Sequence, residues 1–317
     1  MFHVQKISSF DAPELRPYAT MRRSLEHEEE GIFVAEGVKV VRRLLESDFT
    51  VVSVVLPAQA LDGFKVQLEA RPERIAVYVA EKKWLETLTG FSMFQGVLAV
   101  GKIPARVSLE SILQNSPSPR LLAAVDGLTN AENLGALVRN CAAFGVQALL
   151  VGETSSSPFL RRAVRNSMGA IFELPILEIG RQKPPVAAGV PPGGSVTATD
   201  DRHRPPVAAV HDRRSSVTAS VDGPGASRLA QVLLTLRGRG VRCIAAHPRA
   251  EKYLSDADFS KDCCIVFGSE GSGLSKAVLE SCDEAVSIPV TAKVDSLNVG
   301  AAAAVFLYEA ARGRSAH

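Results

Sequence analysis

The chain has 317 residues, of which 46% are hydrophobic and 22% are charged, and its formal net charge is +2. This composition is typical of a globular protein with room for two domains, and it excludes a chain that is strongly basic throughout. A local basic surface for nucleic acid stays open. The five cysteines include no C-x-x-C pair, so neither a disulfide framework nor a zinc site is indicated, and a reducing cytoplasm is the expected location. The first residues also lack the apolar run of a signal peptide, and no segment has the character of a membrane span.

The first third of the chain predicts a small α/β domain at residues 1–104. Residues 12–46 predict helices, because apolar side chains recur at helical spacing towards the end of the stretch. These positions are Val38, Val41, Leu44 and Leu45. Three apolar runs follow, "TVVSVVLP", "IAVYVA" and "GVLAVGKI", and each predicts a buried strand. Residues 105–119 are interpreted as a connection.

The remainder, residues 120–317, predicts a second α/β domain. A strand at 121–125 leads through a loop into a helix at 133–144, which Gly145 ends. Helical and apolar strand patterns then alternate until an Ala-rich helix closes the chain. Such βα alternation is typical of a mostly parallel sheet.

Residues 182–226 interrupt this pattern. They are rich in Pro, Gly, Ser and Thr, and "PPVAA" and "SVTA" each occur twice in them at the same offset, which indicates a duplication. Because the segment contains little that could form a core, we expect a loosely ordered surface insertion, with a functional loop as the alternative.

A glycine-rich segment, "VFGSEGSGLS", follows the apolar run that ends at Phe267. A phosphate-binding P-loop requires Lys-Ser/Thr after the last glycine, and here Leu274 and Ser275 follow Gly273. The order of glycines also differs from the G-x-G-x-x-G of dinucleotide-binding proteins. Without further context, the segment predicts a tight turn between a strand and a helix, with Glu270 solvated near the helix start.

Two further segments carry polar residues at predicted helix starts. In "NAENLGALVRN", Asn133 could cap the helix or contact a ligand, and Arg139 lies two turns further along. In "DSLNVGAAAAVF", Asn298 precedes the Ala-rich helix and could cap it. Each segment therefore has a structural explanation when it is taken alone.

In this order, the three segments together resemble the SpoU, or TrmH-type, branch of the SPOUT superfamily of RNA methyltransferases. The matching residues of its three motifs are Asn133, Gly135 and Arg139; Gly268, Glu270, Gly271 and Gly273; and Ile288, Pro289, Ser296, Leu297, Asn298 and Val299. The family usually has Asp-Pro or a similar pair before the first Asn, where this chain has Ala131-Glu132. The segment "RRSLEHEEEGIFVAEGVKVVRRLLES" resembles the start of the substrate-binding domain of such enzymes, a module similar to a ribosomal-protein RNA-binding fold, and Gln95-Gly96 resembles its closing strand.

The resemblance implies an α/β methyltransferase domain with a deep trefoil knot, S-adenosylmethionine as the cofactor, a homodimer, and methyl transfer to a ribose 2′-hydroxyl of RNA. Ribosomal RNA is the favoured substrate. The alternatives are a tRNA 2′-O-methyltransferase and a non-catalytic RNA-binding protein with the same fold. A nicotinamide dehydrogenase is disfavoured because neither domain begins with G-x-G-x-x-G.

The resemblance also assigns candidate site residues, and none of them implies a metal. The catalytic candidates are Asn133, Arg139, Glu270, Ser296 and Asn298. The cofactor-binding candidates are Gly268, Glu270, Gly271, Ile288, Pro289 and Leu297. The candidates for RNA phosphate contacts, chosen for their charge, are Arg22, Arg23, Arg161, Arg162 and Arg165. A guanidinium has a pKa above about 12, so Arg139 is expected to clamp a phosphate and stabilise an alkoxide and not to act as a base.

Overall fold

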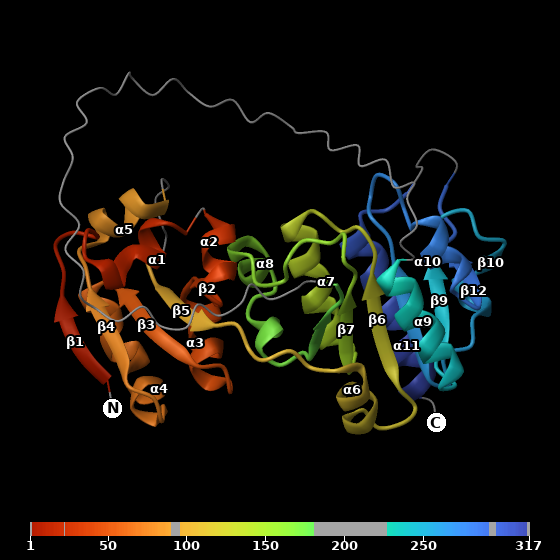
Figure 1. The fold of residues 1–317 in the computed structure, drawn as a ribbon, viewed down its shortest axis with the longest axis horizontal. Helices are drawn as coiled ribbons and strands as arrows, with labels where there is room; N and C mark the ends of the chain where they lie inside the picture. The colour runs from red at the N-terminus through yellow and green to blue at the C-terminus, as the bar shows by residue number, and fades with distance from the viewer. Residues whose placement is uncertain (1, 22, 90–95, 181–226, 292–295, 316–317) are drawn as a thin grey trace, which may run out of the picture.

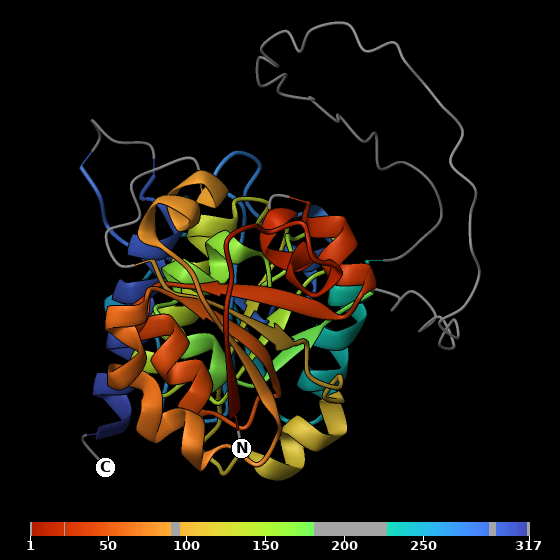
Figure 2. The ribbon, with the colours of Figure 1, turned by 90° about the vertical axis from the view of Figure 1, so that its left-hand side faces the viewer.

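The computed structural model describes residues 2–21, 23–89, 96–180, 227–291 and 296–315, and the predicted insertion at 182–226 lies outside them. Two α/β lobes lie side by side (Figure 1). Figure 2 looks along the long axis of the molecule with the N-terminal lobe in front. None of the helices that these residues form is long and apolar enough to cross a membrane.

The N-terminal lobe is a five-stranded sheet in the order β1-β4-β3-β5-β2. Strand β5 is antiparallel to β3 and β2, and the other pairs are parallel. The strands are β1 (Phe2–Lys6), β2 (Ile32–Glu36), β3 (Val51–Leu56), β4 (Ile75–Val79) and β5 (Leu98–Lys102). The helices are α1 (Arg16–Ala19), α2 (Ser24–Glu29), α3 (Val38–Glu46), α4 (Lys65–Ala70) and α5 (Lys82–Thr89), with 3-10 turns at Pro13–Leu15 and Ala58–Phe64.

The prediction of helices throughout residues 12–46 is wrong in its middle, where β2 lies. Gly31 and Gly37 have φ angles of 66° and 102° and bound a stretch of Ile-Phe-Val-Ala-Glu that is almost entirely buried. Two left-handed glycines and a buried apolar run favour a strand over a continuous helix. The three predicted strands of this lobe are confirmed as β3, β4 and β5.

The C-terminal lobe is a seven-stranded parallel sheet in the order β10-β12-β9-β11-β6-β7-β8. The strands are β6 (Leu121–Val125), β7 (Ala148–Val151), β8 (Ile176–Glu178), β9 (Arg242–Ala246), β10 (Lys252–Tyr253), β11 (Cys263–Phe267) and β12 (Glu284–Ser287). The helices are α6 (Leu109–Asn115), which lies in the predicted connection, α7 (Ala131–Ala143), α8 (Arg161–Asn166), α9 (Arg228–Gly238), α10 (Lys276–Glu280) and α11 (Val299–Ser315), with 3-10 turns at Ala170–Phe172 and Leu254–Asp256. The knot stays a prediction, since residues 292–295, which lead into α11, lie outside the described part of the chain.

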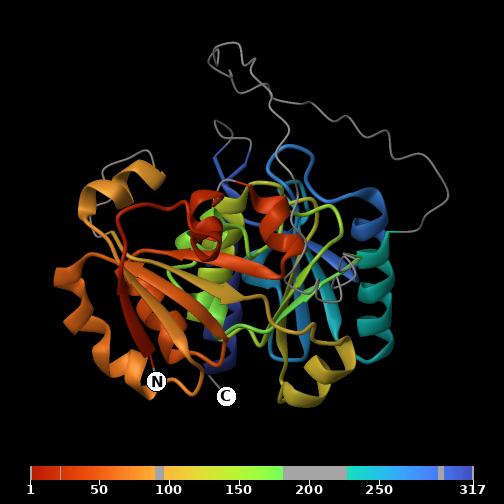
Figure 3. The same ribbon diagram turned by 60° about the vertical axis from the view of Figure 1, so that its left-hand side comes forward.

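Alternate residues of the C-terminal strands face two hydrophobic clusters. Leu122 and Cys264 point to the side covered by α6, α9 and α10, while Ala123 and Ile265 point to the side covered by α7 and α11. Figure 3 shows α9 and α11 on opposite faces of this sheet. Burial on both faces explains why β6, β7 and β11 are continuous apolar runs.

The two lobes share a core and an ion pair. Phe33 and Phe49 of the N-terminal lobe contact Phe159 and Phe172 of the C-terminal lobe, with ring centroids 5.3 to 6.2 Å apart. Beside these rings, the buried carboxylate of Glu36 pairs with two arginines of α8. These are Arg161 and Arg165. The lobes are thus joined by packing as well as by the connecting chain.

Candidate active site

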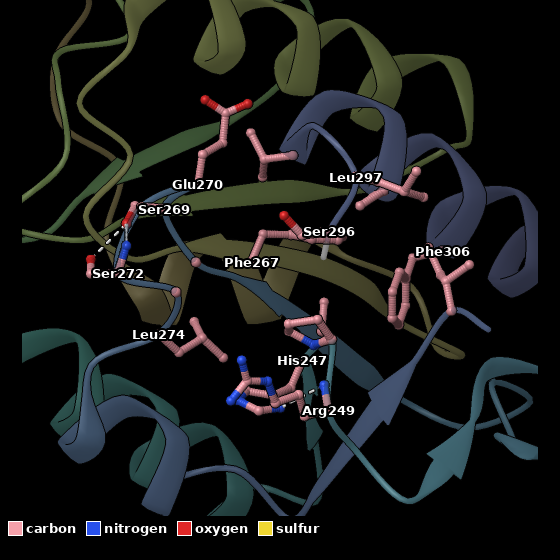
Figure 4. Close-up of a pocket in the computed structure, with 18 of the residues that line it drawn as sticks. His247, Arg249, Phe267, Ser269, Glu270, Ser272, Leu274, Ser296, Leu297 and Phe306 are labelled. Atoms are coloured by element: carbon pink, nitrogen blue, oxygen red, sulfur yellow. Dashed lines mark hydrogen bonds between the residues drawn. The ribbon is translucent and has the colours of Figure 1, made fainter. Parts of the chain in front are cut away.

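A pocket of ≈ 470 Å³ opens at the carboxyl ends of β9, β11 and β12, beside the first turns of α11 (Figure 4). In parallel α/β sheets this edge is where ligands usually bind, and the volume suits a small molecule. Its lining comes from residues 246–249, residues 267–274, Ile288, Val290, Ser296, Leu297, Val299, Ala302 and Phe306. Three loops and one helix therefore build the pocket.

The glycine-rich loop forms one wall and is closed on itself. Ser269 and Gly273 exchange two backbone hydrogen bonds of 3.0 Å each. A Cβ atom on Gly268 would lie 2.3 Å from the carbonyl carbon of Gly273, and Gly273 itself has a φ of 68°. Glycine is therefore required at 268 by the loop's own backbone and at 273 by its conformation. Glu270 is left at the tip of the loop.

The side-chain amide of Asn298 joins the three sequence motifs. Its nitrogen donates to Oδ1 of Asn133, 3.1 Å away, and to Oε1 of Glu270. Its oxygen accepts from the backbone N–H of Gly300 at 2.9 Å, so it also caps α11. Asn298 is thus both the predicted helix cap and a link between motifs that are far apart in the sequence.

Asn133 is free to make this contact because it does not cap α7. The cap is Asn130, whose Oδ1 accepts from the backbone N–H groups of Glu132 and Asn133. The predicted cap at Asn133 is therefore wrong, and the helix begins at Ala131. Gly135 serves packing, since a Cβ atom there would lie 2.4 Å from the carbonyl oxygen of Ala163 in α8.

Arg139 lies on the exposed side of α7 and does not line the pocket of its own chain. Within the part of the chain that the structure describes, its guanidinium has no hydrogen bond and no ion pair. Pro289 is also exposed and outside the pocket lining, whereas Gly268, Glu270, Gly271, Ile288, Ser296 and Leu297 all line it. Asn133 and Asn298 are not in the lining either, but the Asn298 amide joins both of them to Glu270, which is.

No cysteine is among the described residues that line the pocket. Burial raises the pKa of the Cys243 and Cys264 thiols and brings that of Cys282 to about 12, so none is a ready nucleophile. Among the described residues, His, Cys, Asp and Glu side chains form no group of three or more that could hold a metal ion.

Comparison with known proteins decides the family. The profile of the SpoU rRNA methylase family matches residues 120–221 and 213–308, which together span more than half of the chain. The chain belongs to the SpoU rRNA methylase family. Residues 34–106 match a second profile, described as RNA 2′-O ribose methyltransferase substrate binding. The family predicted from the three motifs is thus confirmed.

Relatives of this SpoU-family protein include an uncharacterized tRNA/rRNA methyltransferase of Mycobacterium tuberculosis (strain H37Rv), which is 29% identical over 90% of this chain and 82% of the relative. The 23S rRNA (guanosine-2′-O-)-methyltransferase RlmB of Pectobacterium atrosepticum is 25% identical over 88% of this chain and 97% of its own. The AdoMet-bound rRNA methyltransferase from Sinorhizobium meliloti has a TM-score of 0.71 at 19% identity and covers 98% of both chains. The SpoU methyltransferase AviRb from Streptomyces viridochromogenes has a TM-score of 0.70 at 22% identity, over 96% of this chain and 98% of its own. These likenesses confirm the predicted α/β fold with an N-terminal domain and a C-terminal parallel sheet.

The predicted RNA-binding arginines of this SpoU-family chain have unequal surroundings. Arg22 lies outside the described residues. Arg23 pairs with Glu26 at 3.0 Å. Arg161 and Arg165 pair with Glu36, and only Arg165 keeps most of its side chain exposed, at 61% against 20%. Arg162 is exposed and, among the described residues, has no ionic partner.

Sequence reasoning missed one side of the pocket, the turn His247–Pro248–Arg249. Figure 4 shows His247 and Arg249 across the pocket from Glu270. Their position in the sequence, directly after a predicted strand, is the signal that could have identified them. Both follow a buried strand, β9, whose carboxyl end meets the same sheet edge as the glycine-rich loop.

Proposed function

We propose that this protein transfers the methyl group of S-adenosylmethionine to a ribose 2′-hydroxyl of RNA. The observation that carries the proposal is the Asn298 junction, which brings Asn133 and Glu270 together beside the pocket. Membership of the SpoU family supports it, and relatives are named as RNA methyltransferases.

The pocket has the chemistry that this cofactor requires. Leu274, Ile288, Leu297 and Phe306 offer apolar surface for an adenine ring, and the backbone groups of the glycine-rich loop are accessible. Glu270 is the single carboxylate among the described lining residues and suits a ligand that carries a positive charge. When bound, the cofactor supplies an electrophilic methyl group on a sulfonium.

The residues of this chain then have two tasks, to position the ribose and to stabilise the oxygen as it loses its proton. Glu270, held by Asn298, accepts a hydrogen bond from the ribose hydroxyl and would receive its proton as the oxygen is methylated, while Asn133 and Ser296 orient the sugar. Arg139 holds a neighbouring phosphate and stabilises the developing alkoxide. A guanidinium stays protonated in proteins and therefore does not take that proton itself.

This assignment requires a second copy of the chain, because Arg139 lies outside the pocket of its own chain. The surface that it shares with α11 suits a partner. Val305 and Tyr308 of α11 are 42% and 56% exposed, and Phe144 at the end of α7 packs edge-on against Tyr308. We propose a homodimer through this face, in which each Arg139 serves the pocket of the other protomer.

Ribosomal RNA is the proposed substrate and the cytoplasm the proposed location. The name of the Pectobacterium relative supports ribosomal RNA, and the substrate-binding profile at residues 34–106 supports an RNA ligand for the N-terminal lobe. The names of other relatives include tRNA as well, so tRNA is the second candidate.

The test is transfer of tritiated methyl groups from S-adenosylmethionine to purified ribosomal RNA and, separately, to tRNA. Nucleoside digestion of the labelled RNA should yield a 2′-O-methylated nucleoside. Glu270→Ala should abolish the label. RNA binding without any transfer would favour a non-catalytic RNA-binding protein, and label on a base would contradict ribose methylation.

A further inference from the structure

The turn after β9 holds Arg249 in a fixed place at the pocket. Pro248 and Arg249 are the central residues of a β-turn that the backbone bond from Ala250 to His247 closes at 3.3 Å. Proline at the first central position fixes φ for such a turn. The backbone N–H of Arg249 donates to Nδ1 of His247 at 3.2 Å.

A second set of bonds ties this turn to the neighbouring strand. The backbone N–H of His247 donates to the carbonyl of Val286 in β12 at 2.9 Å. The hydroxyl of Ser287, which is buried, donates to the carbonyl of Ala250, also at 2.9 Å. The backbone at Arg249 is therefore anchored on both sides before any ligand binds.

The side chain of Arg249, by contrast, has no partner. It is exposed and lines the pocket, and among the described residues its guanidinium makes no hydrogen bond or ion pair. His247 aside, it is the one cation among the described residues that line the pocket. It lies across the pocket from Glu270, whose carboxylate points away from it and accepts from Asn298 (Figure 4). The pocket thus presents a negative group on one side and a positive group on the other.

We infer that Arg249 binds the carboxylate of the amino-acid portion of S-adenosylmethionine. The inference rests on the proposed function and adds a binding residue to it. S-adenosylmethionine carries a sulfonium and, at the end of its amino-acid portion, a carboxylate beside an ammonium. The carboxylate is its one anionic group and therefore the one that Arg249 can pair with. A guanidinium presents donors that pair with both oxygens of a carboxylate, and such charge-assisted bonds are the strong ones. With the carboxylate held there, the rest of the cofactor would extend along the pocket towards Glu270, beside which the ribose is expected.

The test compares two ligands that differ in the group that Arg249 is inferred to bind. S-adenosylhomocysteine has the amino-acid portion, and 5′-methylthioadenosine lacks it while keeping the adenosine and the sulfur. Isothermal titration calorimetry gives the affinity of both for the wild type, Arg249→Gln and Arg249→Lys. Arg74→Gln, which removes an exposed arginine from the N-terminal lobe, controls for the loss of one positive charge.

Arg249→Gln should lower the affinity for S-adenosylhomocysteine about tenfold and change the affinity for 5′-methylthioadenosine by less than about twofold. The affinity of Arg249→Lys for S-adenosylhomocysteine should lie between those of the wild type and Arg249→Gln. Arg74→Gln should bind both ligands as the wild type does. Equal weakening of both ligands, or of neither, overturns the inference. The inference is also overturned if Arg249→Gln binds both ligands as the wild type does but binds RNA more weakly, because Arg249 would then contact an RNA phosphate. A wild type that binds neither ligand contradicts the proposed function itself.

Discussion

The side-chain nitrogen of Asn298 donates a hydrogen bond to the carboxylate of Glu270, across 28 residues of sequence. The same amide caps α11 through its oxygen. A substitution that keeps a capping oxygen and removes the amide group that reaches Glu270 can therefore separate stability from activity.

Asn298→Ser should do this, because serine is as good a helix cap as asparagine. We expect the free energy of unfolding to change by less than about 1 kcal/mol. Methyl transfer in a single turnover should slow by about 100-fold, since Glu270 loses the group that holds it.

Asn140→Ser is the matched control for this experiment. Asn140 also joins α7 to α11, by donating to the carbonyl of Gly300 at 2.7 Å, but it has no hydrogen bond to Glu270. Asn140→Ser should change the free energy of unfolding by an amount similar to Asn298→Ser and leave the rate of a single turnover nearly unchanged. Equal loss of rate in both variants would mean that the packing of the two helices, and not the contact with Glu270, governs activity.

Sequence patterns placed the central strands of the parallel sheet because they are buried on both faces and therefore apolar throughout, as in Leu121–Val125 and Cys263–Phe267. They did not predict the short edge strand Lys252–Tyr253, which is polar and partly exposed. They failed at Ile32–Glu36, a short strand that is flanked by two glycines with positive φ and lies between helices. The motifs found most of the pocket, but their meeting at Asn298 joins residues 165 positions apart, which no local pattern contains. Arg139 and the turn at Arg249 depend on how whole elements are placed, and that placement is set by packing.

The arginines of α8 should differ in what they do. Arg161→Met should lower the free energy of unfolding by about 2 to 3 kcal/mol, because it removes the better buried partner of the Glu36 carboxylate. Arg165→Met should cost less than about 1 kcal/mol, since its side chain is 61% exposed and water screens the pair. Chemical denaturation measures both values.

Arg162→Met should behave in the opposite way. Its guanidinium is exposed, so stability should hardly change. If it contacts an RNA phosphate, RNA affinity should fall and the slope of log affinity against log salt should become shallower by about one. An unchanged slope would remove Arg162 from the RNA-binding surface.

Asp262 should make the fold sensitive to acid. Burial acts to raise its pKa, but hydrogen bonds from Ser118 and Arg120 outweigh burial and hold the pKa below the usual value. Because the pKa is lower in the folded state, the carboxylate stabilises the fold fully above the unfolded value of about 3.9, and this contribution is lost as the pH falls through the folded pKa. Asp262→Asn should therefore destabilise the protein at pH 7 by about 1 to 2 kcal/mol and progressively less below pH 4.

The control for this pH profile is Asp62→Asn, which removes an exposed carboxylate from the N-terminal lobe. Denaturation curves between pH 3 and pH 7 should superimpose on those of the wild type. A difference between Asp262→Asn and the wild type that stays constant over this range would show that the carboxylate charge is not responsible.

The segment 182–226 should be dispensable for folding, because its two described flanks already meet. The guanidinium of Arg228 donates to the carbonyl of Gly180 at 3.0 Å, and Glu153 accepts bonds from Ser227, Arg228 and Leu229 at the start of α9. Replacing residues 182–224 by a short Gly-Ser linker should change the melting temperature by no more than a few degrees. A large drop, or insoluble protein, would show that the segment contributes to the core.

The shared active site predicts that two inactive chains can restore each other. Arg139→Ala removes the proposed catalytic cation, and Gly268→Val places a side chain where the backbone of Gly273 lies, so the cofactor loop must shift. In a mixed dimer, one pocket then combines an intact loop from the first variant with an intact arginine from the second.

That mixed dimer should regain about half of the wild-type activity, while each variant homodimer stays inactive. Differently tagged chains, co-expressed and purified through both tags, provide the sample, and its mass in solution establishes that the dimer has formed. If Arg139 acts within its own chain, neither pocket of the mixed dimer is intact. One pocket lacks the arginine, and the other has a defective cofactor loop. A mixed dimer that forms and shows no methyl transfer would therefore place Arg139 in the pocket of its own chain, through a rearrangement of α7.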